Sequence, residues 1–305
     1  MLPAFLHLDD ALTDQPALVD AGIAAGGRGI DARLLGPQLR LWSRPPALDA
    51  LTGLLARTLP ANEGPTLVFA GSGDFHHVSA LLIARAAETS GGPFTVIHVD
   101  NHPDWVRFGA GMHCGSWVGR AARHPAVAHF VTLGVCSSDI RQPWRKGADL
   151  ALLREGHFDL FAYRSPRSDG LHKLGDRFLP TIEHLGEAAF LDMLMARIAT
   201  SAVYVTIDKD ALRADDAVTN WDQGALSLDF LIALIERLRA EFTLVGADVV
   251  GDHSTPVYGG PVLARLWKRG EALIDQPRAT IDRARAASIN KRANRAIATA
   301  FGALR

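Results

Sequence analysis

The chain lacks any long uninterrupted apolar segment. None of its 305 residues lies in a run of about 18 apolar residues, the length that a membrane-spanning helix requires. The first ten residues, MLPAFLHLDD, also lack the basic start and the long apolar core of a signal peptide. We therefore expect a protein that neither crosses a membrane nor is exported, and that works in the cytoplasm.

The sequence also lacks an excess of charge of one sign. Its 32 lysines and arginines nearly balance 33 acidic residues, and no block of five like charges occurs. Nucleic acids and anionic membranes are bound by clustered basic residues, so neither is expected as a partner. The expected partner is a small molecule. Only two cysteines occur, Cys114 and Cys136, which are too few for a disulfide framework and form no CxxC pair.

No internal repeat, low-complexity tract or shift in composition marks a linker, so residues 1–305 are expected to form one domain. Short apolar runs alternate with longer helical patterns, which predicts an α/β fold with a mostly parallel sheet. The expected strands cover residues 38–42, 66–70, 94–99, 129–135, 202–207 and 242–247. The expected helices cover residues 47–58, 78–87, 116–123, 186–199 and 228–240, with a last helix at 280–300. Residues 140–185 are expected to be irregular, apart from a candidate strand at 157–163.

A cluster of potential metal ligands follows one apolar strand. In VIHVDNHPD, residues 96–104, Asp100, His102 and Asp104 occupy alternate positions. Alternate residues of an extended chain share one face, and ligands of open α/β sheets bind at the carboxyl ends of the strands. The alternative is a solvated turn that begins at Asp100 and is fixed by Pro103.

Two further strands end in the same kind of residue. VYVTIDKD places Asp208 and Asp210 at alternate positions, with Lys209 on the other side. The strand at 66–70 leads into GSGDFHHVS, where either His76 or His77 can complete a ligand set. Carboxylates gathered in this way repel one another unless cations hold them. The mixture of carboxylate and imidazole ligands favours two Mn²⁺ ions, with Zn²⁺ or Fe²⁺ as alternatives. Two metal ions held about 3.5–4 Å apart supply a hydroxide nucleophile.

These motifs resemble the signatures of the arginase/agmatinase (ureohydrolase) family. GSGDFHH is similar to Gly-Gly-Asp-His, VDNHPD to Asp-Ala-His-x-Asp, and TIDKD to Ser-Phe-Asp-x-Asp. The resemblance implies a three-layer α/β/α fold around an eight-stranded parallel sheet, with two manganese ions at the strand ends. It also implies roles for the ligands: Asp100 and Asp208 would bridge the ions, His102 and Asp210 would bind one ion, and Asp104 with His76 or His77 the other.

The resemblance extends to residues around the metals. His113, in GMHCGSW, matches a histidine that passes protons at the pocket rim, which suits a side chain whose ordinary pKa is near 6.5. A histidine that caps the next helix is the alternative. Asp139, at the end of VTLGVCSSD, matches a residue that recognises the substrate's α-amino group, although a turn carboxylate would look the same.

One position departs from the family. Gly251 lies where the family has a glutamate that binds the substrate guanidinium, and the next residues, Asp252 and His253, are candidate substitutes. Trp105, Trp221 and Asp222 lie in loops that are expected to face the site. There a tryptophan shapes a pocket for an apolar or aromatic substrate, unless it serves packing alone.

The resulting hypothesis is a metal-dependent hydrolase of a non-peptide C–N bond in a guanidino, amidine or formimino compound, with Asp100 and His113 in catalytic roles. Two alternatives stay open: an amide deacylase or mononuclear zinc deacetylase of the same superfamily, and a relative that binds metal or ligand without catalysis. The family resemblance also leaves a homo-oligomer open.

Overall fold

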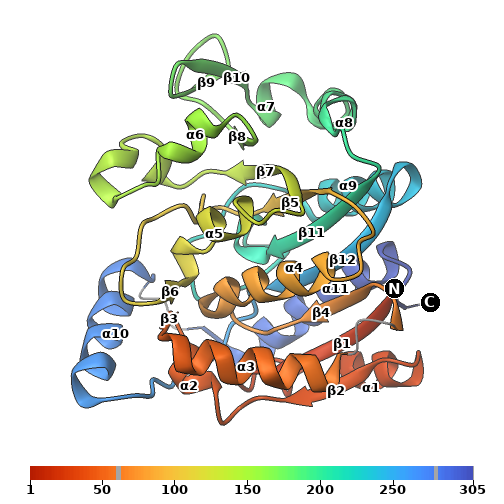
Figure 1. The fold of residues 1–305 in the computed structure, drawn as a ribbon, viewed down its shortest axis with the longest axis vertical. Helices are drawn as coiled ribbons and strands as arrows, with labels where there is room; N and C mark the ends of the chain where they lie inside the picture. The colour runs from red at the N-terminus through yellow and green to blue at the C-terminus, as the bar shows by residue number, and fades with distance from the viewer. Residues whose placement is uncertain (60–62, 278–280, 305) are drawn as a thin grey trace.

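The computed structural model describes residues 1–59, 63–277 and 281–304. Its centre is an eight-stranded sheet in which every strand pair is parallel. The strands follow one another across the sheet (Figure 1) in the order β2 (Arg28–Asp31), β1 (Leu2–His7), β4 (Thr66–Phe69), β12 (Thr243–Val250), β11 (Ala202–Asp208), β5 (Phe94–Val99), β7 (Val127–Val135) and β8 (Phe158–Ala162).

Helices cover both faces of this sheet and produce three layers (Figure 1). The helices are α1 (Pro16–Ala24), α2 (Gly36–Leu39), α3 (Pro45–Thr58), α4 (Ser79–Ala87), α5 (Val118–Ala122), α6 (Ala151–Glu155), α7 (Ile182–Leu185), α8 (Glu187–Arg197), α9 (Leu228–Glu241), α10 (Val262–Asp275) and α11 (Arg283–Ala300). In the view of Figure 1, α4 and α5 lie in front of the sheet, whereas α9 and α11 lie behind it. The three-layer α/β/α fold predicted from the sequence is confirmed.

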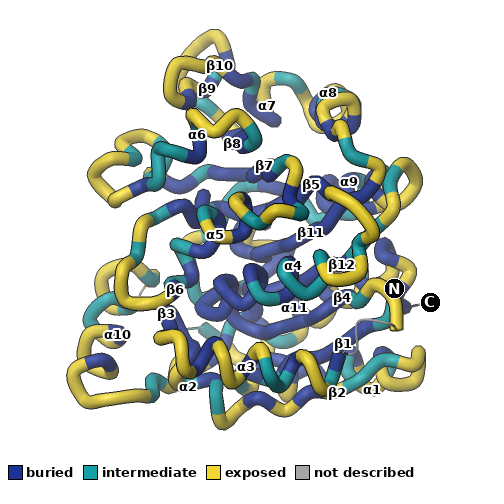
Figure 2. Tube along the Cα trace, in the orientation of Figure 1, coloured by how far each residue is buried: buried dark blue, intermediate teal, exposed yellow. Residues whose placement is uncertain are grey.

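Two neighbouring strands near the centre of the sheet, β5 and β11, are buried along their whole length, as strands covered on both faces must be. Every residue of β5 and of β11 is buried (Figure 2). The predicted boundaries of these strands are correct to within one residue, and β8 confirms the candidate strand at 157–163. Helix α9 begins after Ser227, whose Oγ accepts a hydrogen bond from the Phe230 N–H at 3.0 Å.

The strand predicted at residues 38–42 is wrong. Residues Gly36–Leu39 form α2 instead, with a proline in its first turn, where the absent N–H costs nothing. The backbone of Leu41 then takes a positive φ of 64°, so α2 and the short strand β3 (Trp42–Ser43) do not form one continuous element. This strand pairs antiparallel with β6 (Met112–His113). Among the described residues, no helix has both the length and the apolar character needed to cross a membrane.

Candidate functional site

Three strand ends deliver acidic and imidazole side chains to one place. The turn after β4 forms a 3₁₀ helix, η2 (Gly73–Val78), Asp100 follows β5, and Asp208 ends β11. In the sheet, β11 pairs with β5 on one side and with β12 on the other, and β12 pairs with β4. Because parallel strands end at the same edge, the side chains meet there.

One half of the cluster surrounds His76. Its Nδ1 lies 3.1 Å from Oδ2 of Asp100, 3.1 Å from Oδ2 of Asp104 and 3.7 Å from Oδ2 of Asp208. The other ring nitrogen, Nε2, bonds the Thr206 hydroxyl at 3.1 Å, and this hydroxyl donates to Asp248. The Thr206 contact fixes the ring so that Nδ1 faces the three carboxylates.

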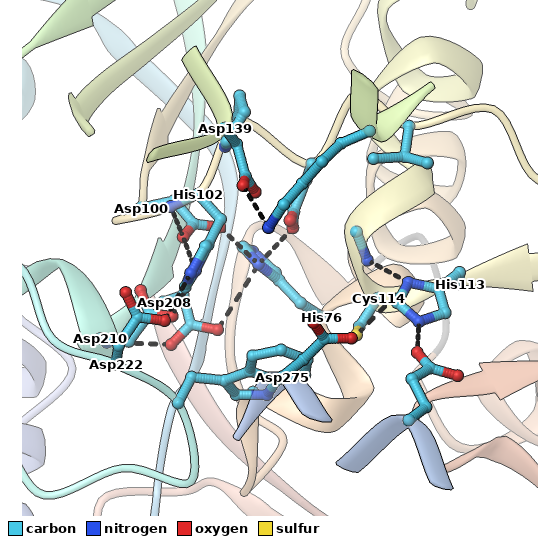
Figure 3. Close-up of a pocket in the computed structure, with 18 of the residues that line it drawn as sticks. His76, Asp100, His102, His113, Cys114, Asp139, Asp208, Asp210, Asp222 and Asp275 are labelled. Carbon is cyan, nitrogen blue, oxygen red and sulfur yellow. Dashed lines mark hydrogen bonds and ion pairs between the residues drawn. The ribbon is translucent and has the colours of Figure 1, made fainter. Parts of the chain in front are cut away.

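The other half surrounds His102. Its Nδ1 lies 2.9 Å from Oδ2 of Asp210 and 3.7 Å from Oδ1 of Asp100, and its Nε2 bonds Asp222 at 3.0 Å. Asp100 therefore touches both halves, with Oδ2 toward His76 and Oδ1 toward His102. Figure 3 shows Asp100, Asp208 and Asp210 gathered beside the His102 ring. Two overlapping groups here have the spacing to hold a metal ion, His76 with His98, Asp100 and Asp104, and His102 with Asp100 and Asp210. Together with Asp208, these donors suit a carboxylate-rich metal centre.

Burial and the charges of neighbouring carboxylates raise the pKa values of three carboxyl groups in the cluster. Burial, followed by the charge of Asp100, raises the pKa of Asp104 to about 6, and the same two causes raise the pKa of Asp208 to about 6. Burial and the charges of Asp208 and Asp100 also raise the pKa of Asp210 well above its ordinary value. Divalent cations would relieve this repulsion, because they neutralise the groups that raise the pKa values.

His77 lies outside the cluster. Successive residues of a 3₁₀ helix point about 120° apart, so neighbouring histidines in η2 cannot face the same point. The His77 Nε2 is hydrogen-bonded to Ser43 Oγ at 2.8 Å, and burial holds the pKa of His77 well below its ordinary value. Of the two histidines left open by the sequence, the structure places His76 among the carboxylates and His77 against Ser43, outside the cluster.

The cluster forms the floor of a pocket of about 470 Å³. Apolar and aromatic side chains line one part of its wall: Val106, Phe108, Trp221 and Trp267. Acidic side chains beyond the floor line another part: Asp139, Asp222, Glu271 and Asp275. Lys146 is the only lysine or arginine among the described lining residues, and its Nζ lies 2.6 Å from Asp139.

His113 lies in the pocket wall and also caps the turn that follows it. Its Nδ1 accepts a hydrogen bond from the Gly115 N–H at 2.8 Å, so the ring proton belongs on Nε2. That Nε2 bonds the carboxylate of Glu271, which belongs to α10. His113 thus caps this turn and also lines the pocket, and Figure 3 shows its ring apart from the Asp100 group.

Helix α10 supplies one side of the pocket with Trp267, Glu271 and Asp275, which lie one helical turn apart on one face. Besides the contact between Glu271 and His113, further polar contacts hold this helix to the rest of the molecule. Lys268 Nζ donates to the Gln38 carbonyl at 2.9 Å, and Gln276 Nε2 donates to Asp74 at 2.7 Å.

The buried ammonium of Lys268 predicts how the stability of the protein depends on pH. Burial lowers the pKa of Lys268 to about 8, below the 10.5 of a free lysine. The folded protein therefore loses this proton first, and its stability rises as the pH increases from 8 toward 10.5. We expect Lys268→Met to flatten this rise by about 1 kcal/mol between pH 7.5 and 9.5, measured by urea unfolding. The exposed Lys291 of α11 is the matched control, and an unchanged rise in Lys268→Met would contradict the prediction.

Three expected substrate contacts lie elsewhere. Trp105 is 1% exposed and packs against Phe158, with ring centroids 6.0 Å apart. Asp252 is buried, and its Oδ1 lies 2.5 Å from the Nζ of Lys209. Its carboxylate therefore neutralises the buried Lys209 ammonium and is not free to bind a ligand. His253 is half-buried and does not line the pocket. None of these three lines the pocket, whereas Asp139, Trp221 and Asp222 do.

Several residues at the site escaped the sequence analysis. His98 precedes Asp100 by two positions on β5, and its Nε2 lies 2.9 Å from Oδ2 of Asp100. The same alternation that identified Asp100 and His102 contained this signal. For Trp267, Glu271 and Asp275, the signal was a spacing of four residues along a helix that was not predicted.

Known proteins share sequence features and the fold with this chain. The model of the Arginase family matches residues 48–254. No curated protein sequence matches the chain. Among solved structures, arginase from Bacillus caldovelox is 15% identical, with 99% of both chains covered and a TM-score of 0.58. Formimidoylglutamase from Bacillus subtilis is 14% identical, with 97% of this chain and 86% of that chain covered and a TM-score of 0.56.

Proclavaminate amidino hydrolase from Streptomyces clavuligerus is 18% identical, with 88% of this chain and 75% of that chain covered and a TM-score of 0.52. Identities this low show a shared fold. The family match is stronger, because it spans more than half of the chain and includes the turn after β4 and both Asp-rich strand ends. The chain therefore belongs to the arginase family.

Proposed function

We propose that this protein is a dinuclear metal-dependent hydrolase of a non-peptide C–N bond in a small guanidino, amidine or formimino compound. The observation that carries the proposal is the convergence of His76, His102 and four aspartates at the floor of a pocket. The solved structures that share the fold include proteins named arginase, formimidoylglutamase and amidino hydrolase.

The residues present fit a pair of divalent ions. Asp100, Asp104 and Asp208 with His76 would hold one ion, and Asp100, Asp208 and Asp210 with His102 would hold the other. Carboxylate-rich sites of this kind favour Mn²⁺, with Zn²⁺ or Fe²⁺ as alternatives. When bound, the ions would lower the pKa of water and so supply a nucleophile at neutral pH.

The chain's own residues would handle the proton and exclude water. His113 donates its Nε2 proton to the Glu271 carboxylate at the pocket wall, and a further proton taken up by this pair would be the one delivered to the leaving amine. Glu271 holds that nitrogen in place. Trp221, which is fixed by a 2.9 Å hydrogen bond from its Nε1 to Asp74, lies against the His102 ring and narrows the space above the ligands.

The outer wall favours a substrate with a cationic end over one with a carboxylate end. Four carboxylates stand beyond the metal ligands, and the single lysine is already paired with Asp139. A second carboxylate, brought by the substrate, would meet uncompensated negative charge, whereas an ammonium or guanidinium would be attracted by several groups. The aromatic rings of Trp221 and Trp267 would add cation–π contacts.

Other features of the proposal concern the cellular setting. We infer a cytoplasmic protein formed by one domain over residues 1–305, with a small molecule as its partner and neither nucleic acid nor membrane bound. Assembly into a homo-oligomer is part of the proposal as well. Sedimentation of the metal-loaded protein would measure it.

The test is metal content followed by turnover. Protein loaded with Mn²⁺ and freed of excess ion should contain two metals per chain by elemental analysis. It should then hydrolyse members of a panel of alkylguanidines, amidines and formimino compounds, with urea, ammonia or formamide as the measured product. Compounds with an amine at the far end should have KM values at least about tenfold lower than those with a carboxylate.

Other outcomes have definite meanings. One ion per chain with hydrolysis only of acylated amines would replace the proposal with a mononuclear deacylase. Two ions with no turnover of any member would support a binding protein. An absence of bound metal would remove the basis of the proposal.

A further inference from the structure

His98 is a buried imidazole at the metal-ligand cluster that the proposed function does not use. It lies on β5, where Phe94, Val96, His98 and Asp100 alternate onto one side of the strand. The ring is 0% exposed and is enclosed by Trp117 and Phe130, with ring centroids 5.1 and 5.8 Å away. A polar ring in such surroundings must satisfy both of its nitrogens.

Both nitrogens have partners, and the partners identify the tautomer. Nε2 lies 2.9 Å from Oδ2 of Asp100. Nδ1 lies 3.0 Å from the hydroxyl of Thr132, the residue on β7 that is paired with His98 in the sheet. A carboxylate that ligates a metal is ionised and can only accept, so the Nε2–H of His98 donates to Asp100, and Nδ1 accepts from the Thr132 hydroxyl.

The oxygen that His98 contacts is central to the cluster. Oδ2 of Asp100 also lies 3.1 Å from Nδ1 of His76, while Oδ1 faces His102. We propose that His98 is a positioning residue for Asp100: its Nε2–H fixes the carboxylate so that one oxygen serves each half of the dinuclear site. This inference rests on the proposed metal centre and is independent of the substrate.

The chain of contacts predicts a graded effect on metal affinity. Hydrogen bonds to ligating side chains orient them, and their loss costs about 10–100-fold in metal affinity. His98→Phe keeps an aromatic ring in the apolar enclosure but removes the donor. His98→Gln keeps an N–H group that can reach Asp100, and Thr132→Val removes only the hydroxyl that sets the His98 tautomer.

The experiment is equilibrium binding of Mn²⁺ to metal-stripped protein, by titration against a chelator of known affinity. We expect the Kd of at least one ion to rise about 10–100-fold in His98→Phe, by less in His98→Gln, and several-fold in Thr132→Val. His129→Phe is the matched control. It removes a histidine of β7 that pairs with Asp159 at the opposite end of the strands, and it should bind both ions as the wild type does.

Distinct results would overturn the inference. Wild-type affinity in both His98→Phe and Thr132→Val would show that the ring only fills space. Should His98→Phe fail to fold, wild-type affinity in Thr132→Val would be decisive in the same way. Loss of a nitrogen ligand from the visible spectrum of Co²⁺-loaded His98→Gln would make His98 a direct ligand and contradict the positioning role. Wild-type protein that binds no Mn²⁺ would instead overturn the proposed function and, with it, this inference.

Discussion

Asp100→Asn combined with Asp208→Asn should abolish metal binding, from two ions per chain to fewer than about 0.2, and should reduce turnover at least about a thousand-fold. The reason is that these carboxylates lie between the two imidazole groups. Asp100 is 3.1 Å from His76 on one side and 3.7 Å from His102 on the other. A neutral amide has no charge with which to hold two cations together. Elemental analysis and product release measure the two effects.

The stability of the single variant Asp208→Asn distinguishes lost metal from lost structure. The double variant is unsuited to this test, because the pKa of Asp100 is held well below its ordinary value and the loss of that charge destabilises the fold. The pKa of Asp208 is about 6 in the folded protein, above the ordinary 3.8, so its ionised form destabilises the metal-free fold at pH 8. Removing that charge should therefore raise the free energy of unfolding of metal-free protein by about 1–3 kcal/mol. Asp192→Asn, at an exposed site on α8, is the control and should change neither quantity. A double variant that retains two ions and turnover would contradict the proposed mechanism.

Burial decides which elements of the fold could be predicted from the sequence. Strands β5 and β11 are covered on both faces, so their sequences are almost wholly apolar and could be identified without neighbours. Strand β2 has only one buried residue among four, and its pattern carries no such signal. Helix α10 has only two buried residues, Ala264 and Lys268, so its apolar face is turned outward and the usual link between pattern and core is missing.

The candidate site was predictable where ligands share a strand and not where they meet through tertiary contacts. Asp100 and His102, and likewise Asp208 and Asp210, are paired by the alternation of an extended chain. The choice between His76 and His77 depends on which way a 3₁₀ helix faces, which a contact with the distant Ser43 reveals. The link between His113 and Glu271 spans 158 positions, so sequence spacing carries no trace of it.

Gly251→Ala should lower the free energy of unfolding by about 3 kcal/mol and weaken Mn²⁺ binding at least about tenfold. Gly251 has a φ of 91°, which only glycine adopts without strain. A Cβ atom there would overlap Oδ1 of Asp208 and would lie 2.5 Å from the backbone nitrogen of Lys209. A side chain at this position therefore displaces a metal ligand. Urea unfolding and chelator competition measure the two effects.

The same overlap explains why a glutamate has no room at this position. Gly251→Glu should therefore lose metal and fail to improve hydrolysis of guanidines, even though it restores the residue type expected from the family resemblance. Gly270→Ala is the matched control, because a Cβ atom on that α10 glycine meets nothing within 4 Å. It should stabilise the protein by about 0.4–1 kcal/mol through the unfolded state and leave metal binding unchanged. If Gly251→Glu bound two ions and hydrolysed alkylguanidines faster than the wild type, this prediction would be contradicted. The proposed role of the outer-wall carboxylates in substrate recognition would then be wrong as well.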